Sequence, residues 1–380
     1  MIRVFRGNLV TPFKTIKRGQ IEINHSKITY VGQARSTEGK IVDFGSSIIA
    51  PGFIDIHIHG LSGYDVMDED EESIQQISRI LPSKGVTGFL ATLQTAPYFE
   101  IINALKRVKK MIDLGVPGAK VLGSHLEGPY INFNKKGAQQ DYIRKPKLNE
   151  LQEIIEAAED TLKVITLAPE VQGGVEAVKF LKDQNIVVSA GHTDATYDEA
   201  KKSFLAGVSM LGHFWNGMRG LHHREPGIVG AGLTCENIAV ELIADCHHVH
   251  PVILELTVRM KGASKVTLVS DSIKPAGLAE GNYLYNGVNY KIVNGLVKLP
   301  SGIIAGSSIG LDTAVKNMVQ KVGLNINKVF QMASDTPAKI LGIDSKGRLE
   351  SGYDADLVIM DNEFNVLETV VEGITVYKRE

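Results

Sequence analysis

The stretch "PGFIDIHIHG", residues 51–60, decides the fold and places two histidines one residue apart among isoleucines. Side chains alternate between the two faces of a strand, which predicts one apolar face and one polar face. The predicted apolar face holds Ile54, Ile56 and Ile58. The predicted polar face holds Asp55, His57 and His59. A single buried histidine is most often a core residue with satisfied hydrogen bonds, whereas two imidazoles on one face can share a metal ion.

The composition argues against several kinds of partner. The chain has 380 residues, with 41 basic and 43 acidic side chains and no long run of one sign. This balance predicts neither a nucleic-acid partner nor a basic membrane face. The N-terminal residues contain no apolar segment of signal-peptide length, and no run of about 18 apolar residues occurs, so we expect a soluble cytoplasmic protein. Cys235 and Cys246 are too few for a disulfide framework.

Short apolar runs alternate with amphipathic segments through the middle of the chain, which is typical of βα units around a parallel sheet. Eight runs occur: "FIDIHIH", "GFLATLQT", "KVLGSHLEG", "KVITLAPE", "IVVSAGH", "SMLGHFWNG", "AVELIADCHH" and "KVTLVSD". Segments that favour helices, such as "ESIQQISRILPSKG" and "DATYDEAKKSFLAG", separate them. Eight repeats predict an α/β fold with a closed (β/α)8 barrel of the TIM type.

Polar residues gather where these runs end. They are His57, His59, Thr95, Glu127, Glu170, His192, His213, His247, His248 and Asp271. In a (β/α)8 barrel the active site lies at the C-terminal ends of the strands. Because every run contributes, the pattern supports the barrel and predicts an active site at that end.

The two ends of the chain differ from the middle. Residues 1–50 and 346–380 contain short β-rich segments with turns, which predict a small β-sandwich domain built from both ends. Residues 51–345 would then form the barrel. A glycine-rich stretch near 281–300 predicts a β-hairpin insertion on the active-site face, where it could cover a substrate.

Three of the polar strand-end residues have the composition of a catalytic metal site. Glu127, His192 and His213 give one carboxylate and two imidazoles, which leaves one coordination position open. Adding His57 and His59 gives five possible ligands, so a second ion that shares Glu127 is reasonable. Asp271 could accept a proton from activated water and return it to a leaving group, or it could be a helix N-cap.

The chain resembles the N-acetylglucosamine-6-phosphate deacetylase family of the amidohydrolase superfamily over nearly its whole length. The stretches that carry the resemblance occur in family order: "PGFIDIHIHG", "HLEGPYINFNKKGA", "GHTDA", "GHFWNGM", "HHREPG", "ADCHHVHP", "SDSIKPAG" and "IAGSS". The resemblance implies a metal-dependent deacetylase of a sugar phosphate. It also implies a divalent metal on Glu127, His192 and His213, and some members hold a second ion at the position of His57 and His59. We expect zinc, with iron, manganese or cobalt as alternatives.

The resemblance also implies roles for residues outside the metal ligands. Asp271 is similar to the family's general base and acid, and His248 to the histidine that polarises the amide carbonyl. The implied substrate-binding residues are Ala138, Gln139, Asn216, Gly217, Arg224, His248 and Ile309. Asn216 and Gly217 would bind the phosphate together with Arg224 of a neighbouring subunit, which implies a homodimer. Ile309 falls where the family lines the pocket for the acetyl methyl group.

Three positions depart from the family pattern. Gln139 stands where many members carry a histidine that contacts the sugar, Cys246 where glycine is usual, and Ser272 where alanine is usual. A glutamine can still form a hydrogen bond with a hydroxyl group. These departures affect the expected sugar specificity and leave the metal chemistry intact.

Two alternative functions remain open at this stage. Other amidohydrolases, such as cyclic-amide hydrolases and D-amino-acid deacylases, often use a carboxylated lysine on the fourth strand as a metal bridge, but "KVITLAPE" has no lysine at its end. A non-catalytic scaffold could keep the barrel without its chemistry. The complete set of polar residues at the strand ends argues against that scaffold.

Overall fold

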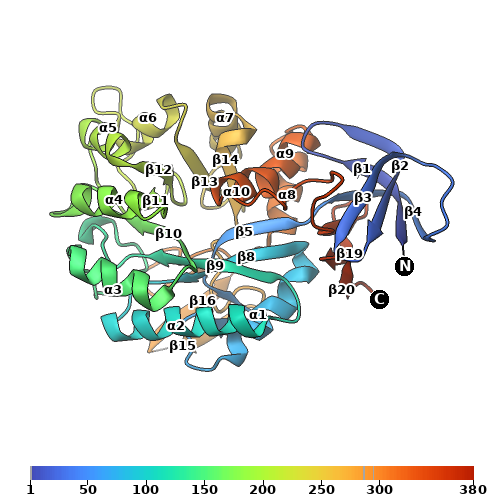
Figure 1. The fold of residues 1–380 in the computed structure, drawn as a ribbon. Helices are drawn as coiled ribbons and strands as arrows, with labels where there is room; N and C mark the ends of the chain where they lie inside the picture. Colours follow the sequence, from blue (N-terminus) through green and yellow to red (C-terminus); the bar gives the residue numbers. More distant parts are fainter. Residues whose placement is uncertain (1, 286, 294) are drawn as a thin grey trace.

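Eight parallel strands form a barrel, as the apolar runs predict (Figure 1). The computed structural model describes residues 2–285, 287–293 and 295–380. The barrel strands are β5 (Phe53–Ile58), β8 (Val86–Leu93), β9 (Lys120–Glu127), β10 (Leu162–Leu167), β11 (Val187–Ala190), β12 (Val208–Leu211), β13 (Ala239–Ile243) and β14 (Val266–Val269). Neighbours in this sheet follow chain order from β5 to β14. Just beyond β14, Asp271 N donates to His57 O over 2.8 Å and joins the last strand to the first.

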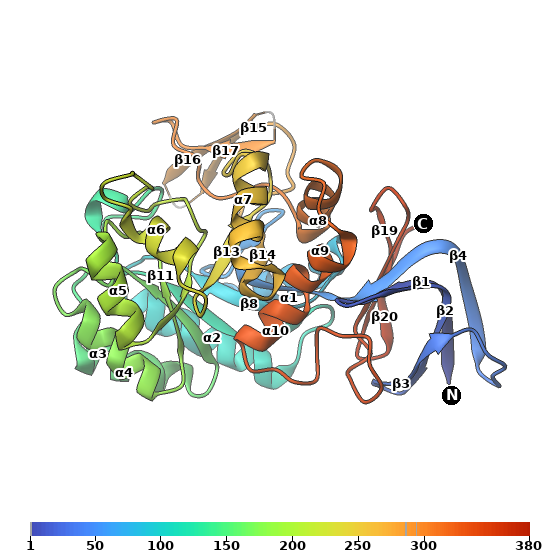
Figure 2. The ribbon, with the colours of Figure 1, turned by 90° about the horizontal axis from the view of Figure 1, so that it is seen from above.

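Helices follow the barrel strands and cover their outer side (Figures 1 and 2). They are α1 (Glu72–Ile80), α2 (Tyr98–Leu114), α3 (Leu148–Ala158), α4 (Gly174–Asp183), α5 (Tyr197–Ala206), α6 (Gly227–Thr234), α7 (Pro251–Lys261), α8 (Leu311–Gln320), α9 (Ile326–Ala333) and α10 (Asp335–Ile340), with short 3-10 helices at Leu81–Lys84, Phe133–Lys135 and Ala263–Lys265. The sequence explains the start of α5, because Thr196 and Glu199 form a reciprocal capping box there. No helix in the described residues is long and apolar enough to span a membrane.

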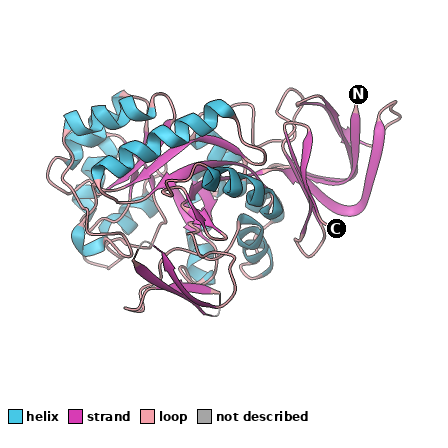
Figure 3. Ribbon diagram, turned by 90° about the horizontal axis from the view of Figure 1, so that it is seen from below, coloured by secondary structure: helices cyan, strands magenta, loops and turns pink. Residues whose placement is uncertain are grey.

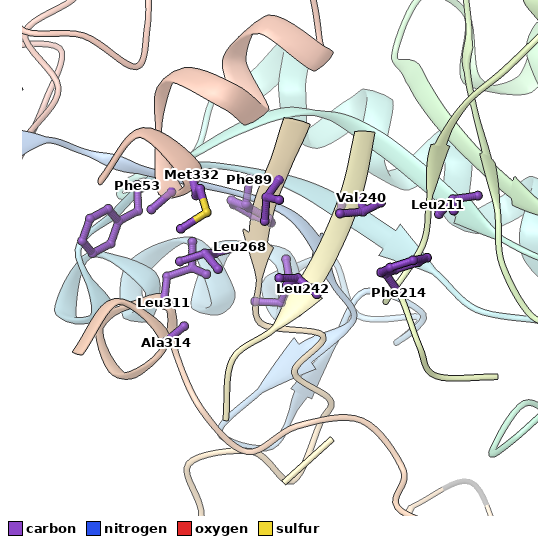
Figure 4. Packing of buried hydrophobic residues seen from close by; sticks show 14 of the residues in the cluster. Phe53, Phe89, Leu211, Phe214, Val240, Leu242, Leu268, Leu311, Ala314 and Met332 are labelled. Atoms are coloured by element: carbon purple, nitrogen blue, oxygen red, sulfur yellow. The ribbon is translucent and has the colours of Figure 1, made fainter. Parts of the chain in front are cut away.

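The main apolar core lies between the barrel strands and the helices. Phe53 and Phe89 on the strands, and Leu311 and Met332 on α8 and α9, are almost fully buried in this cluster (Figure 4). Burying a side chain of this size contributes about 1.5–3 kcal/mol. A smaller apolar cluster, which includes Ile54, fills the barrel interior. Several of its members come from barrel strands that are far from β5 in the order of the sheet, and such strands can meet only inside the barrel.

The alternation predicted for residues 54–59 is wrong in part. Ile54 and Ile56 belong to the interior cluster, but Ile58 packs in the core between strands and helices. The pairing of β5 with β8 shifts register between Asp55 and Ile58, and such an irregularity interrupts the two-residue period. Asp55 therefore does not join the two histidines but lines a separate small cavity.

The two ends of the chain meet beside the barrel, as predicted, and their strands form one continuous seven-stranded sheet (Figures 1 and 3). Its strands are β1 (Arg3–Val10), β2 (Thr15–Asn24), β3 (Lys27–Gln33), β4 (Lys40–Pro51), β18 (Leu357–Met360), β19 (Val366–Val371) and β20 (Ile374–Lys378). Strand β4 pairs with β1 on one side and with β18 on the other. The sheet has its own apolar core, which includes Phe5, Ile21, Ile49, Leu357 and Val370.

A small antiparallel sheet follows the last barrel strand and stands over one end of the barrel (Figure 2). Its strands are β15 (Gly281–Tyr285), β16 (Val288–Val293) and β17 (Leu296–Lys298). A two-stranded ribbon, β6 (Gly60–Leu61) and β7 (Tyr64–Asp65), leaves the barrel directly after β5. Both additions therefore lie near the strand ends that carry the predicted site.

Candidate active site

The C-terminal ends of the barrel strands surround a cavity of about 320 Å³. Most of the predicted site residues line it: His59, Glu127, Ala138, Gln139, His192, His213, Asn216, Gly217, His247, His248 and Asp271. His57 is fully buried behind them. The structure thus brings the proposed metal ligands, the proposed acid and base, and several proposed substrate contacts into one place.

Glu127, His192 and His213 form the first candidate metal position. Glu127 Oε1 lies 3.1 Å from His192 Nε2 and 3.0 Å from His213 Nε2, and the two Nε2 atoms are 3.1 Å apart. The Nδ1 atoms face backbone carbonyl oxygens of Lys135 and Asn216, at 2.9 and 3.1 Å. Carbonyl oxygens accept hydrogen bonds, so each Nδ1 carries a proton and each Nε2 can offer its lone pair to a metal.

This arrangement fits a divalent cation. The Nε2 lone pairs of His192 and His213 and the Glu127 carboxylate oxygen face one another, and in this tautomer no proton lies between them. A shared cation would offset the repulsion among these three atoms. Ligands about 2.0–2.1 Å from a tetrahedral zinc ion are roughly 3.3 Å from one another, close to the spacing of these three atoms. One carboxylate and two imidazoles also leave a coordination position open for a reactant.

The second candidate metal position consists of His57, His59 and Asp271. The two Nε2 atoms are 3.3 Å apart, and Asp271 Oδ1 lies 3.6 Å from His57 Nε2 and 3.5 Å from His59 Nε2. Glu127 reaches this position too, because its Oε2 is 3.3 Å from His59 Nε2. The two positions therefore share one carboxylate, which is the geometry that the sequence suggested for a pair of ions.

Three of these residues adopt left-handed backbone conformations directly after their strands. The φ angles are 47° at His192, 29° at His213 and 46° at Asp271. Such conformations are unfavourable for residues other than glycine and tend to be found at functional sites. Here each conformation occurs where the chain leaves a barrel strand, and it places a candidate metal ligand or the candidate acid at the C-terminal end of the barrel.

Negative charge dominates the site and raises the pKa values of His57 and His59. Burial opposes protonation of His57, but the carboxylates of Glu241, Glu127 and Asp271 outweigh it and raise the His57 pKa well above its ordinary value. For His59, the same competition between burial and the two carboxylates Asp271 and Glu127 raises the pKa to about 9. Burial also opposes ionisation of Glu127, yet the nearby imidazoles hold its pKa well below the ordinary range. The site attracts positive charge, as a metal centre must.

Asp271 and His248 lie on the cavity wall beside the two metal positions. His248 Nδ1 is 2.6 Å from Asp245 Oδ2, and Asp245 Oδ1 accepts from the backbone N–H groups of His247 and His248, both at 2.8 Å. The Asp245 carboxylate thus fixes the orientation of the His248 ring. The remaining ring nitrogen of His248 is available to the cavity.

Gln139 makes contacts that the sequence did not reveal. Its Oε1 accepts from Thr95 N over 2.9 Å, and its Nε2 donates to Glu127 Oε2. Both polar atoms of this side chain therefore have protein partners, and one partner is the shared metal ligand. The strand-end residue Thr95 contributes through its backbone N–H and is not part of the cavity lining.

Two buried polar residues beneath the site escaped the sequence reasoning. Glu241 Oε2 accepts from His57 Nδ1 at 2.8 Å and from His213 N at 2.9 Å. His125 packs edge-on against His57, with ring centroids 4.6 Å apart. Both nitrogens of His125 have partners, Ile56 O at 3.1 Å and Thr166 Oγ1 at 2.8 Å, so it supports the ligands and is not one of them. A carboxylate inside the apolar run "AVELIAD" was the signal for Glu241.

Some expected site residues lie elsewhere in this chain. Arg224 is exposed, and its Nη1 contacts His223 Nε2 at 2.8 Å. Ile309 lines the same small cavity as Asp55 and does not line the main one. Glu170 holds the loop after His192, because Oε1 accepts from Asp194 N and Oε2 from Thr193 Oγ1, both over 2.6 Å.

Two departures from the family pattern, Cys246 and Ser272, differ in how well they fit the structure locally. Cys246 adopts a φ of 66°, a conformation that favours glycine. Ser272 Oγ donates to Gly60 O over 2.7 Å, so its extra hydroxyl group has a partner. Both cysteines are free thiols.

Comparisons with known proteins agree with this geometry. The amidohydrolase family model matches residues 48–376. The N-acetylglucosamine-6-phosphate deacetylase of Vibrio furnissii is 40% identical over 338 residues, covering 88% of this chain and 84% of that protein. The N-acetylgalactosamine-6-phosphate deacetylase of Escherichia coli O157:H7 is 39% identical over 335 residues, covering 88% of this chain and 89% of that protein.

A solved structure shows the same architecture. A mutant N-acetyl-D-glucosamine-6-phosphate deacetylase from Mycobacterium smegmatis, in complex with N-acetyl-D-glucosamine-6-phosphate, superimposes with a TM-score of 0.94 at 26% sequence identity. The alignment covers 100% of this chain and 99% of that one. The chain therefore belongs to the amidohydrolase family and, within it, to the N-acetylglucosamine-6-phosphate deacetylases.

Proposed function

We propose that the protein hydrolyses the acetamide group of N-acetylglucosamine 6-phosphate to give glucosamine 6-phosphate and acetate. One observation carries the proposal most directly. Glu127, His192 and His213 converge at 3.0–3.1 Å beside Asp271, on the wall of a cavity large enough for a monosaccharide. The relatives that share the fold are named for this type of reaction.

The metal would be held by Glu127, His192 and His213, with His57 and His59 available for a second ion. A divalent cation bound there supplies Lewis acidity, which activates water and polarises a carbonyl oxygen. Zinc suits two imidazoles and a carboxylate, and iron, manganese and cobalt can use the same ligands.

Asp271 handles the protons of the reaction. As a carboxylate it accepts a proton from the attacking water, and it then donates that proton to the nitrogen of the departing amine. The second transfer is needed because an amide anion is a very poor leaving group. The pKa of Asp271 is lowered, because the charges of His57 and His59 and a hydrogen bond from His59 outweigh its burial, so the base form is the resting state.

The remaining cavity residues bind the substrate. His248, whose Nδ1 donates to the Asp245 carboxylate, donates from Nε2 to the developing oxyanion in its doubly protonated form. Ala138 and Gln139 lie against the sugar. Asn216 and the Gly217 backbone bind the phosphate together with Arg224 from a second subunit. Ile309 lines a different cavity, so it has no substrate contact in this proposal. Arg224 is exposed and outside its own cavity, which is consistent with a role in a homodimer.

Other functions fit less well. A metal-bridging lysine on the fourth strand is the usual sign of several other amidohydrolases, but Lys163 of β10 contacts Asp160 O over 2.8 Å. The strained conformations of His192, His213 and Asp271 argue against a scaffold without activity, because backbone strain costs stability and is found mainly at functional sites. A second candidate substrate is N-acetylgalactosamine 6-phosphate, because a relative of nearly equal identity is named for it. A phosphorylated sugar substrate is consistent with a cytoplasmic enzyme.

Acetate release tests the proposal. Purified protein, with its metal content measured by mass spectrometry, would be assayed with N-acetylglucosamine 6-phosphate, its galacto epimer and unphosphorylated N-acetylglucosamine. We expect the first substrate to react fastest and the unphosphorylated sugar slowest. Faster turnover of the galacto epimer would assign the second candidate substrate, and metal-loaded protein that releases no acetate from any of the three would refute the proposed function.

A further inference from the structure

We propose that Glu241 is a positioning residue that joins the two candidate metal positions through one oxygen atom. Glu241 lies on β13, and it is completely buried. Its Oε2 accepts from the His57 side chain, which belongs to the second position, and from the backbone of His213, which belongs to the first. The inference rests on the proposed metal-dependent function and concerns how the protein prepares its ligands.

The contact with His57 selects the tautomer of its ring. A carboxylate only accepts, so the proton of neutral His57 resides on Nδ1, which is 2.8 Å from Glu241 Oε2. The lone pair then resides on Nε2. That atom faces His59 Nε2 at 3.3 Å and Glu127 Oε1 at 3.4 Å, so it points into the second position.

The contact with His213 fixes a strained ligand. The φ of His213 is 29°, and its backbone N–H donates to Glu241 Oε2 over 2.9 Å. A charged acceptor makes this hydrogen bond stronger than one to a neutral carbonyl group. The same oxygen thus holds the conformation that turns the His213 ring toward Glu127.

The burial of Glu241 supports a functional reason for its presence. Its Oε1 has no hydrogen-bond partner among the described residues. An apolar side chain at this position would reduce the stability of the fold less than Glu241 does, because transferring a carboxylate from water into the interior costs free energy. Nearby bound cations would offset that cost.

Metal titration of the protein tests the inference independently of turnover. Apoprotein would be titrated with Co²⁺, whose visible absorption reports the ligands of each bound ion. We expect wild type to bind two ions and Glu241→Leu to bind the ion at His57 and His59 about 10–100-fold more weakly, the usual effect of losing such a ligand support. Glu241→Gln keeps a carbonyl acceptor without the charge, so its affinity should fall between the two.

Two controls separate positioning from a general loss of structure. Thr267 lies opposite Glu241 in the register of β13 and β14, and its buried hydroxyl group has no partner among the described residues. Thr267→Val should therefore leave both Co²⁺ affinities unchanged. In a His57→Ala background, Glu241→Leu should add less than about threefold to the loss at the second position, because it acts there through His57.

Three results would overturn the inference. They are wild-type Co²⁺ affinities in folded Glu241→Leu protein, an undiminished effect of Glu241→Leu in the His57→Ala background, and a wild type that binds one ion at every concentration. Each is distinct from failure of the proposed function, which would appear as fully metallated wild type without acetate release.

Discussion

At the scale of single residues, Glu127 is the centre of the site. Four imidazoles lie within 3.4 Å of its carboxylate oxygens, from His57, His59, His192 and His213, and Gln139 donates to it as well. A carboxylate has two oxygens with about four lone-pair directions, so one residue can serve two metal positions and still accept a hydrogen bond. No imidazole could replace it in this role, because a ring nitrogen offers one lone pair.

The proton-transfer role of Asp271 predicts a separation between metal binding and turnover. Asp271→Asn should retain the ion at Glu127, His192 and His213 and lose about 10²- to 10⁴-fold in kcat, the usual contribution of general acid–base catalysis. Acetate release and metal content would be measured on the same samples. Ser272→Ala, one residue away, is a matched control that should stay within a few-fold of wild type. An Asp271→Asn enzyme with near-normal kcat would remove Asp271 from the mechanism.

The chemistry-bearing residues could be predicted because they interrupt apolar runs at strand ends. Glu127, His192 and His213 were found this way, and the structure brings them within 3.1 Å of one another. Glu241 was missed because it lies inside its run, where the periodicity predicts only a core residue. Contacts made by backbone groups, such as Lys135 O with His192 Nδ1, depend on loop conformation and leave no mark in the sequence.

At the scale of elements, strand β9 carries a prediction about acid stability. Burial and then the charge of His57 lower the pKa of His125 from 6.5 to about 3. The unfolded chain binds this proton at a higher pH than the folded one does. The stabilisation is therefore complete above about pH 6.5 and is lost as the pH falls toward 3, with a limit of roughly 5 kcal/mol.

Chemical denaturation of the metal-free protein between pH 7 and pH 4 checks this effect. The free energy of unfolding of wild type should decrease more steeply over this range than that of His125→Asn. The variant is less stable at neutral pH because it loses the bond to Thr166 Oγ1. Only the difference between the two slopes is diagnostic, and equal slopes would show that His125 does not contribute to acid lability.

The small sheet of β15 to β17 predicts a role in substrate binding. Tyr290 of β16 lines the cavity, whereas Tyr283, its pairing partner on β15, does not. Tyr290→Ala should raise KM about tenfold, which corresponds to about 1.4 kcal/mol of lost contact, without changing metal content. Tyr283→Ala is the matched control, because the hydroxyl group that it removes donates to Ala279 O over 2.8 Å and does not reach the cavity. Equal KM values for the two variants would mean that this sheet does not contact the substrate.

Element identity proved easier to predict than side-chain direction. All eight barrel strands follow from apolar runs of strand length between helical patterns, and α5 lies in the stretch "DATYDEAKKSFLAG" that favours a helix. The direction of Ile58 and Asp55 could not be obtained in the same way, because the register shift between β5 and β8 depends on a partner strand about 30 residues away. Long-range pairing of this kind has no local signal.

At the scale of the whole molecule, the proposal that Arg224 completes the active site of a second subunit can be tested by mixing two variants. Arg224→Ala and Asp271→Asn homodimers should both be weak, the first mainly toward the phosphorylated sugar, because an arginine fork recognises phosphate. A mixed dimer would contain one site with an intact Asp271 from one subunit and an intact Arg224 from the other.

Co-refolding the two variants in equal amounts measures this complementation. About half of the dimers would be mixed and each would have one complete site, so activity should return to about a quarter of wild type. Refolding each variant alone gives the baseline. Absence of recovery, with subunit exchange demonstrated by mass spectrometry, would show that Arg224 acts within its own chain or has no role in the reaction.

The position of β4 between β1 and β18 has a consequence for how the protein is made. Strand β4 ends at Pro51 and β18 begins at Leu357, so a ribosome must add about 300 residues before the two can pair. At about 5–20 residues per second, the N-terminal half of that sheet waits roughly 15 to 60 s with an unpaired edge. An unpaired strand edge can pair with other chains, so newly made protein is most vulnerable to aggregation during this interval. Stalled or truncated products that lack β18 keep the unpaired edge of β4 permanently.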